Sequence, residues 1–578
     1  MEAIIRVGGA AGTGVASVGA ILSKMATRSG LHVQTYNFYQ SVIRGGHVAY
    51  HIRISDKEIY SLGDGVDYAL ALDEEAAKIL MPSLSSGGFL IYDIDTLEVD
   101  KSLLPEGANL LPIPLVSLAR KEGRETRMLN TSGVGALAGL LCLDKEILKE
   151  ILWEQWAGKS KRVAEYNVSA AFAGYNYIQE QESGCRRDFN TTSKRRLLIS
   201  GNEAIALGAI AAGCRFYSFY PMTPATSISY PMIANAEKYG IVAKQAEDEI
   251  AVINMAIGAG FAGARAMCGT SGGGFALMSE ALGEAGITET SVVVVESARG
   301  GPSTGLPTRT EQGDLNQILG ASQGDYPKIV LAPGTAEECF YASAEAFNLA
   351  DRFQCPVIIS IDLTLSESLS SIDSLDARVP IERPIQAKDR GEGEKFKRYI
   401  VTETGISPIA FPGEPDLMFI AGSDDHDEEA TLLSDVLAGL PYMLVERRKQ
   451  MEKRMSKLET ALKELPPPQI EGPDDAQITI IGYGSTKGAI RDARHLLKKE
   501  GITVNHLHIR YIMPFHSKEV KSLLEGKKCL VVEANYTGQL QRLIMAETCL
   551  GEQFHYLRKY DGDPIYPREI VNAVKEVL

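Results

Sequence analysis

Between residues 220 and 314, several side chains have the types and spacing needed for acid–base chemistry and carboxylate binding. Glu249 is the first of them, and it begins an apolar run that extends to residue 264. Isoleucines and a phenylalanine recur in that run at helical spacing, which predicts a helix buried on all sides. No cation lies between Lys244 and Arg265. A carboxylate buried there either complements a helix N-terminus or waits for a ligand that hydrogen-bonds to it.

A proline-flanked threonine precedes this helix. The segment Tyr220-Pro-Met-Thr223-Pro follows a short apolar run at 216–219, which predicts a strand. Each proline fixes its own φ and biases the preceding residue toward extended geometry. The Thr223 hydroxyl is therefore expected on a rigid turn at the carboxyl end of a strand, where α/β sheets place ligands. Tyr220 begins the same turn and is a second candidate for substrate contact.

Two further segments offer binding groups. Residues 299–314 form a polar loop rich in Gly and Pro, and long loops of this kind are usually functional. Its Arg299 and Arg309 are alternative candidates for a bidentate carboxylate clamp, with Thr308 beside them. Residues 269–275 predict a glycine-rich turn before a helix at 276–282. There Ser271 either caps the helix or, with Thr270 and Gly272, lines a ligand site.

Composition limits the function classes. The chain has 578 residues with 45% hydrophobic and 23% charged, and its formal charge is −15, which argues against nucleic-acid or anionic-membrane binding. No apolar run reaches about 18 residues, and no basic and apolar leader begins the chain, so we expect a cytoplasmic protein. Eight scattered cysteines without a CxxC pair favour a reducing compartment and no metal centre held by this chain alone.

Strands alternate with helices along most of the chain, which predicts an α/β fold of three successive units with mostly parallel sheets. The first strand leads into a glycine turn at 8–14 that departs from the dinucleotide fingerprint, so close packing and anion binding both remain open. The basic–apolar alternation at 51–55 predicts a solvated edge strand, or else a subunit contact or anion site. The charged helix at 449–459 is expected to present a solvated face.

Taken together, the Tyr220–Thr226 motif, Glu249 and the 299–314 loop resemble the α subunit of the 2-oxoacid:ferredoxin oxidoreductases in its fused γ–α form. The resemblance covers nearly the whole chain. It divides the chain into a γ-like domain at 1–182, a linker at 183–196 and a thiamine pyrimidine-binding domain at 197–375. A connecting segment with a charged helix and a Pro-rich stretch follows at 376–475, and a transketolase C-terminal-like domain completes the chain at 476–578.

The resemblance also implies roles. Thr223 corresponds to the threonine that contacts the 2-oxoacid, and Arg299 best matches the arginine that meets its carboxylate, with Arg309 kept as the alternative. Glu249 corresponds to the acid that bonds N1′ of the thiamine aminopyrimidine and thereby promotes ionisation of thiazolium C2. Gly258, nine residues further on, supports this choice over Glu247.

The resemblance implies oxidative decarboxylation of a 2-oxoacid, 2-oxoglutarate first and pyruvate second, with coenzyme A as acyl acceptor and ferredoxin as electron acceptor. Gly63-Asp64-Gly65 has no Asn at the spacing of a magnesium–diphosphate motif. Mg²⁺ and [4Fe–4S] clusters are therefore expected on a β subunit, with a dimer of heterodimers as the expected assembly, and no metal is expected on this chain. The alternatives are a subunit of a non-oxidative, transketolase-like thiamine enzyme and a non-catalytic nucleotide-binding assembly subunit.

Overall fold

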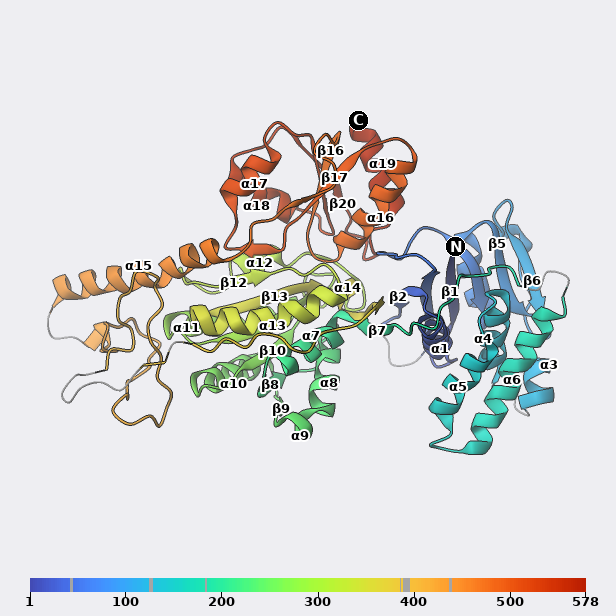
Figure 1. Cartoon of the computed structure of the whole chain (residues 1–578), viewed down its shortest axis with the longest axis horizontal. Helices are drawn as coiled ribbons and strands as arrows, with labels where there is room; N and C mark the ends of the chain where they lie inside the picture. The colour runs from blue at the N-terminus through green and yellow to red at the C-terminus, as the bar shows by residue number, and fades with distance from the viewer. Residues whose placement is uncertain (42–44, 124–127, 182–184, 385, 388–395, 436–438) are drawn as a thin grey trace. The chain divides into compact units, whose positions relative to one another are not determined.

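The computed structural model describes residues 1–41, 45–123, 128–181, 185–384, 386–387, 396–435 and 439–578. Two compact units account for these residues. Unit 1 comprises Met1–Ser200, Glu367–Leu375 and Tyr566–Glu569, and unit 2 comprises the remainder. Among the described residues the strands form three sheets, mostly parallel, with helices between successive strands, so the predicted α/β class is confirmed (Figure 1). The domain boundaries given above stay predictions.

Unit 1 contains one mixed sheet in the order β6-β5-β4-β1-β3-β2-β14-β7. Its strands are β1 (Glu2–Ala10), β2 (His32–Phe38), β3 (His47–Ser55), β4 (Val66–Ala71), β5 (Leu84–Asp93), β6 (Asn109–Ile113), β7 (Leu197–Ser200) and β14 (Leu369–Ile372). β1, β4, β5 and β6 run parallel, whereas β2 and β3 pair antiparallel. The serine-rich stretch after residue 363 thus contributes a strand to this sheet, which the sequence did not indicate.

The helices of unit 1 cover both faces of this sheet. They are α1 (Val15–Arg28), α2 (Glu74–Leu80), α3 (Leu115–Gly123), α4 (Leu129–Leu140), α5 (Lys145–Trp156) and α6 (Lys161–Gln179). α1, α4 and α5 share one apolar core with one face of the strands, whereas α2 packs on the opposite face. Gly12 and Gly14 have φ of 92° and 91° in the turn before α1, a conformation that favours glycine.

The expectation of a solvated edge at 51–55 is wrong. β3 lies between β1 and β2, and its polar side chains are buried: His51 is 1% exposed and Arg53 is 8% exposed. Burial, with Arg6 nearby, lowers the pKa of His51 to about 3. The two terminal nitrogens of Arg53 have partners: Nη2 pairs with Glu2 at 2.8 Å and Nη1 donates to the carbonyl oxygen of Ser61 at 3.0 Å. Internal pairing therefore explains the basic residues of this strand.

Unit 2 is built on two sheets. The larger has the order β18-β12-β13-β11-β10-β8-β9 and is parallel apart from β18. Its strands are β8 (Phe216–Phe219), β9 (Val242–Gln245), β10 (Ala266–Thr270), β11 (Val292–Ala298), β12 (Ile329–Leu331), β13 (Pro356–Asp362) and β18 (Tyr511–Met513). The helices along this part of the chain are α7 (Gly201–Ala211), α8 (Ser229–Ala234), α9 (Ala236–Tyr239), α10 (Glu249–Phe261), α11 (Gly272–Ile287), α12 (Leu315–Leu319), α13 (Ala336–Phe353) and α14 (Leu363–Glu367).

The second sheet of unit 2 has the order β15-β17-β16-β19-β20. Its strands are β15 (Ile470–Glu471), β16 (Ile478–Gly482), β17 (Val504–His508), β19 (Cys529–Glu533) and β20 (Phe554–Arg558), and the helices of this region are α15 (Leu440–Glu464), α16 (Thr486–Lys499), α17 (Ser517–Leu524), α18 (Gln539–Thr548) and α19 (Pro567–Val577). One apolar cluster runs from α10 and α11 to this second sheet. The two sheets therefore share a core, which fixes the loops between them.

α10 is the helix expected to be buried on all sides, and that expectation is wrong for one stripe. Ile250 is 50% exposed, and Asn254 and Gly258 follow it on the same face at intervals of four. The opposite face, including Val252 and Ile253, is fully buried. Residue types alone do not distinguish the two faces, because both are mainly apolar.

The expectation of a solvated face for the charged helix is also wrong. Lys453 and Lys457, on successive turns of α15, are fully buried and bracket the equally buried Glu289. The Nζ to carboxylate oxygen distances are 2.5 Å for Lys453 and 2.6 Å for Lys457. Burial lowers the pKa of Lys453 to about 7 despite the attraction of Glu289. Burial alone would raise the pKa of Glu289, but the two lysines and Arg398 outweigh it and lower that pKa.

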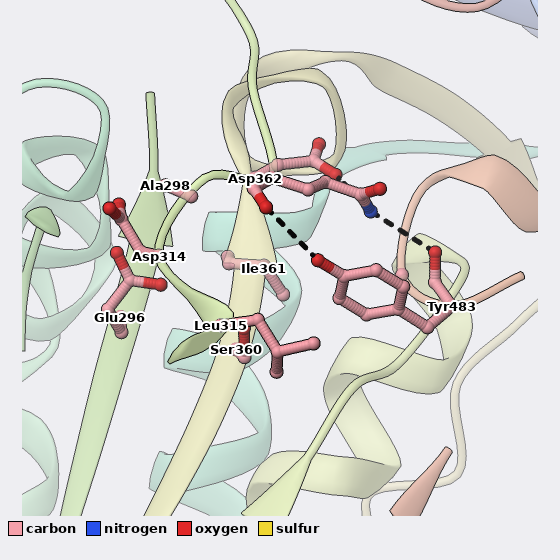
Figure 2. Close-up of a pocket in the computed structure, with 10 residues that line it drawn as sticks. Glu296, Ala298, Asp314, Leu315, Ser360, Ile361, Asp362 and Tyr483 are labelled. Carbon is pink, nitrogen blue, oxygen red and sulfur yellow. Dashed lines mark hydrogen bonds between the residues drawn. The ribbon is translucent and has the colours of Figure 1, made fainter. Parts of the chain in front are cut away.

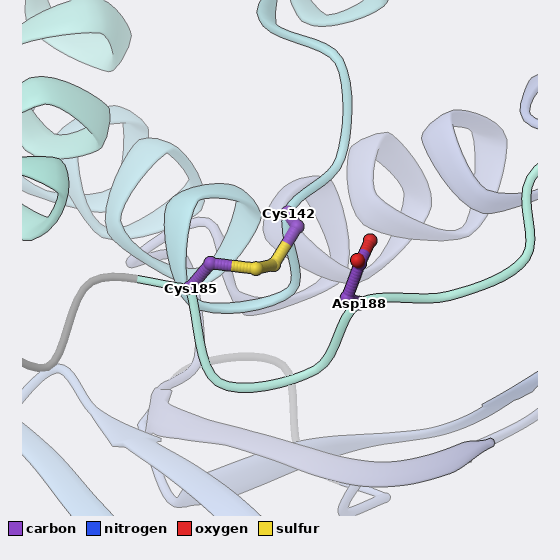
Figure 3. Close-up of side chains that lie close together, drawn as sticks. All are labelled: Cys142, Cys185 and Asp188. Atoms are coloured by element: carbon purple, nitrogen blue, oxygen red, sulfur yellow. A yellow bond between two sulfur atoms is a disulfide. The ribbon is translucent and has the colours of Figure 1, made fainter.

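Two of the scattered cysteines meet in space. Cys142, just after α4, and Cys185 form a disulfide that spans 43 residues, and Asp188 lies beside it (Figure 3). The spacing of the cysteines in the sequence favoured a reducing compartment and did not indicate this pair. Among the described residues, no helix combines the length and apolarity needed to cross a membrane.

Candidate functional site

A cleft of about 680 Å³ opens in unit 2 at the carboxyl ends of β10 and β11. Its walls are the N-terminus of α11, the 299–314 loop and the loop at 535–539. Side chains tie the last two walls together. The Gln539 side chain donates to the carbonyl oxygen of Gly313 at 2.7 Å and accepts from the Asn316 amide at 2.8 Å. Ligands of α/β sheets bind in this position, outside the carboxyl ends of the strands.

Arg299 lines the cleft and connects it to the proline-flanked turn. Its Nη1 donates a hydrogen bond to the backbone carbonyl oxygen of Thr223 at 2.7 Å. Met222, the residue before Thr223, lines the same cleft. The structure therefore brings together the two motifs that the sequence separates by 76 residues.

Glu249 lies at the first position of α10 and is 3% exposed. The Oγ1 atom of Thr270, at the end of β10, donates to its Oε1 at 3.3 Å. Gly274 allows this arrangement, because a Cβ at that position would lie 2.3 Å from Glu249 Oε1 and 2.1 Å from Thr270 Oγ1. Asp248, and not Glu249, caps the helix, by accepting from the Ala251 amide at 2.9 Å.

The N-terminus of α11 forms a wall of the cleft. Ser271 occupies the N-cap position but makes no side-chain cap hydrogen bond, so the expectation of a capping serine is wrong. Its Oγ is buried and has no hydrogen-bond partner among the described residues. Gly272 and Gly273 line the cleft beside it, where backbone N–H groups of a first helical turn can bind an anion.

Three other residues predicted to bind substrate, Arg309, Thr308 and Tyr220, do not line the cleft. Arg309 does not line the cleft, and its side chain packs on Gly562, where a Cβ would lie 2.9 Å from Arg309 Cβ. Thr308 is 8% exposed and likewise lies outside the cleft lining. Tyr220 is 38% exposed, on the turn that carries Met222. Of the two arginines, Arg299 therefore has the geometry of a cleft residue.

Sequence reasoning assigned no binding role to the loop at 535–539. Asn535 is 1% exposed, and its amide donates to the carbonyl oxygen of Gln312 at 3.1 Å and to Glu533 at 2.7 Å. Tyr536, Thr537 and Gln539 complete this wall. The available signal was a polar, glycine-containing loop after a buried strand. The position after a strand is one that it shares with the Thr223 turn, which was identified by its two prolines.

A smaller buried pocket adjoins the cleft and contains three carboxyl groups, from Glu296, Asp314 and Asp362 (Figure 2). Asp314 lines both cavities. Burial raises the pKa of all three groups, and Asp314 and Asp362 raise that of Glu296 further. Asp362 accepts hydrogen bonds from the Leu365 amide, the Ser485 hydroxyl and Gln312.

The sequence matches three family profiles along most of its length. Residues 4–177 match the family described as pyruvate ferredoxin/flavodoxin oxidoreductase. Residues 207–430 match the thiamine diphosphate-binding part of pyruvate flavodoxin/ferredoxin oxidoreductase, and residues 476–570 match core domain II of pyruvate:ferredoxin oxidoreductase. The cleft and Glu249 fall in the thiamine-binding match, and the 535–539 wall falls in the last one.

Full-length relatives agree with these matches. The chain is 33% identical to the 2-oxoacid:ferredoxin oxidoreductase subunit alpha of Sulfolobus sp., over 99% of this chain and 96% of the relative. It is 29% identical to the 2-oxoglutarate oxidoreductase subunit KorA of Mycobacterium tuberculosis, over 100% of this chain and 91% of the relative.

A solved structure shares the whole fold. The 2-oxoglutarate:ferredoxin oxidoreductase from Magnetococcus marinus, with 2-oxoglutarate, coenzyme A and succinyl-CoA bound, superposes with a TM-score of 0.92 at 33% identity. The match covers 100% of this chain and 99% of that one. The chain therefore belongs to the family of 2-oxoacid:ferredoxin oxidoreductase alpha subunits.

Proposed function

We propose that this chain, with a β subunit, oxidatively decarboxylates a 2-oxoacid, forms the acyl-CoA and delivers the electrons to ferredoxin. The observation that supports this proposal best is the convergence on one cleft of Arg299, the Thr223 turn and the N-terminus of α11. Buried Glu249 lies directly beside that helix. This combination offers a carboxylate for an aminopyrimidine and a guanidinium for a substrate carboxylate.

The residues around Glu249 fit the pyrimidine half of thiamine diphosphate. Glu249 is buried with Thr270 as its hydrogen-bonding neighbour, and the orphaned Ser271 Oγ lies one residue further along the chain. Glu249 would hydrogen bond to N1′ of the ring and hold a proton there, while Thr270 fixes its carboxylate. Thiamine diphosphate, when bound, would supply the carbon nucleophile that decarboxylation requires.

Arg299 and Thr223 would bind the carboxylate of the 2-oxoacid. The hydrogen bond from Nη1 to the Thr223 carbonyl orients the guanidinium at the wall of the cleft, where it would meet the substrate carboxylate. The Thr223 hydroxyl would add one donor. Thr223, Arg309, Thr308 and Tyr220 do not themselves line the cleft. Thr223 is the first choice among them because Arg299 hydrogen bonds to its backbone and the adjacent Met222 lines the cleft.

We propose 2-oxoglutarate as the first substrate to test and pyruvate as the second. A relative and a solved homologue that cover the full chain are named for 2-oxoglutarate, and the homologue also binds coenzyme A. The profiles that match, in contrast, carry the name of pyruvate. Coenzyme A is the proposed acyl acceptor.

A β subunit must complete this site. The sequence has no CxxC pair, and no Asn follows Gly63-Asp64-Gly65 at the spacing of a diphosphate motif. We therefore assign Mg²⁺ and the [4Fe–4S] clusters to the β subunit. A dimer of heterodimers and a cytoplasmic location stay predictions.

The test is methyl viologen reduction by this chain co-expressed anaerobically with its β subunit, given coenzyme A and either 2-oxoglutarate or pyruvate. We expect reduction that requires both subunits and coenzyme A. A complex that binds thiamine and consumes the 2-oxoacid without reducing viologen would instead indicate the non-oxidative thiamine enzyme. Absence of thiamine binding would indicate the nucleotide-binding assembly subunit.

A further inference from the structure

Two carboxyl groups that line one buried pocket lie at the two ends of the 299–314 loop. Glu296 lies in β11, three residues before Arg299, and Asp314 is the residue before α12. Figure 2 shows their carboxyl groups side by side on the same side of the pocket. Glu296 is fully buried, and neither of its oxygens meets an N–H or O–H donor elsewhere in the described chain. Two carboxyl groups can hydrogen bond to each other only when one of them carries a proton.

Asp314 connects this pair to the cleft. It lines the buried pocket with Glu296 and also lines the cleft with Arg299. Its Oδ2 lies so close to Gly272 that a Cβ on that glycine would be 2.3 Å away. Asp314 thus lies against the N-terminus of α11. Burial raises the pKa of Asp314, whereas the charge of Arg299 lowers it.

Other ionisable groups act on the pair from neighbouring segments. Asp362, at the end of β13, raises the pKa of Glu296. Tyr483, after β16, lines the same pocket, and its own pKa is raised by burial and by the surrounding carboxylates, so it adds no charge near neutral pH. Glu311 lies on the loop itself, and burial raises its pKa. Arg299 is the cation that acts on Asp314.

We propose that Glu296 and Asp314 share one proton, and that this proton limits the negative charge facing Arg299 so that the guanidinium can bind the substrate carboxylate. Both acids are positioning residues that act through Arg299, and this step rests on the proposed function. Buried carboxyl groups side by side titrate as a pair and hold one proton well above the usual carboxyl range. Loss of that proton would put a second negative charge next to the arginine and repel the incoming carboxylate.

The consequence is a pH-dependent KM. In the wild-type complex, we expect the KM for the 2-oxoacid to rise about tenfold for each pH unit above the pKa of the pair, because only the protonated pair permits binding. Glu296→Gln keeps a neutral donor to Asp314 and cannot lose a proton. The variant should therefore keep a constant KM over the same pH range, with kcat close to that of the wild type.

The matched control is Asp362→Asn, which changes the third carboxyl group of the same pocket. Asp362 has its own donors in Gln312 and Ser485, so this variant should retain the rise in KM. If the pocket had a purely structural role, the pH dependence of KM would change alike in Glu296→Gln and Asp362→Asn. A rise that persists unchanged in Glu296→Gln would overturn the proposal.

A second readout does not depend on turnover. Because other buried carboxyl groups, such as Asp362, also have raised pKa values, the readout is the infrared difference spectrum of wild type minus Glu296→Gln. For the purified full-length chains at neutral pH, it should show the C=O stretch of one protonated carboxylic acid. If that variant does not fold, Asp314→Asn and the pH titration of the wild-type band replace it. The absence of an acid band that titrates would refute the shared proton. If the band is present but the complex has no 2-oxoacid activity, the proposed function would be refuted instead.

Discussion

Removing the buried carboxylate of Glu289 should destabilise unit 2 severely. Glu289 lies just after α11 and pairs with both Lys453 and Lys457, and all three side chains are fully buried. Arg398 adds a third cation next to the same carboxylate, and its Nη2 donates to the Glu289 carbonyl oxygen at 3.0 Å. Glu289→Gln keeps the volume of the side chain but leaves these cations without their counter-charge.

The expected loss is about 3–5 kcal/mol in the free energy of unfolding, the range found when one partner of a buried ion pair is removed. A pair with an exposed lysine sets the lower comparison. On the same helix, Lys449 pairs with Glu446 at 2.6 Å, and the lysine side chain is 53% exposed whereas the glutamate is 9% exposed. Lys449→Met should cost much less than Glu289→Gln, because solvent already screens the lysine.

The loss should also shrink as the pH rises. Burial already lowers the pKa of Lys453 to about 7 from its usual 10.5, and without Glu289 it falls further. Below about pH 7, Lys453 keeps its proton in the folded wild type but has lost it in the folded variant, whereas the unfolded chain binds it in both. The stability of the variant therefore increases with pH up to about 7 while that of the wild type does not, and the difference between them shrinks. The slope is about 1.4 kcal/mol per pH unit for each lysine that is neutral in the folded state and protonated in the unfolded chain.

Urea denaturation of the wild type, Glu289→Gln and Lys449→Met at pH 5 and pH 7, on the acid side of the wild-type Lys453 pKa, measures these differences from the transition midpoints. A Glu289→Gln loss below about 1 kcal/mol would show that the cluster is not a buried ion network. A loss of the expected size that is the same at both pH values would refute the argument that the lysines give up their protons.

The remaining predictions concern the site and the disulfide. Glu249→Gln should lower kcat of the assembled complex by roughly 10²–10⁴-fold while the circular dichroism spectrum stays unchanged, and undiminished turnover would reject its role. Arg299→Lys should raise the KM for the 2-oxoacid by roughly tenfold or more, because the bidentate geometry is lost, as an initial-rate series would show. Thr223→Val should raise KM less, since Arg299 bonds the backbone carbonyl and not the hydroxyl. Cys142→Ser should lower the stability of the oxidised chain by up to about 4 kcal/mol, from the closure entropy of the loop, and equal denaturation midpoints would show that the bond does not form.

The sequence predicts the regular elements well where their hydrophobic pattern is local. The first strand with the helix after it (β1–α1) and the strand before the proline-flanked turn (β8) lie where the apolar runs, the glycines and the prolines placed them. The convergence of Arg299 with the Thr223 turn also follows from a general rule, because both segments end parallel strands of one sheet. The composition of β14 did not predict a strand, because its serines are equally common in loops.

The errors occur where tertiary partners decide burial. His51 and Arg53 look like solvated residues until Glu2, Ser61 and Leu62 satisfy them inside the sheet. Lys453 is indistinguishable in sequence from the exposed lysines of α15, because its partner Glu289 lies 164 residues earlier. Long-range pairing of this kind cannot be obtained from local periodicity.

The position of β14 in the chain affects how unit 1 can fold during synthesis. β7 pairs with β14, and β14 separates it from β2, yet β14 is about 170 residues downstream of β7. At usual elongation rates the ribosome needs roughly 10–30 s to reach that strand after β7 has emerged. During this interval β2 exposes an unpaired edge, which is the part of a sheet most prone to aggregate with other chains. The first 200 residues, expressed alone, would keep that edge permanently.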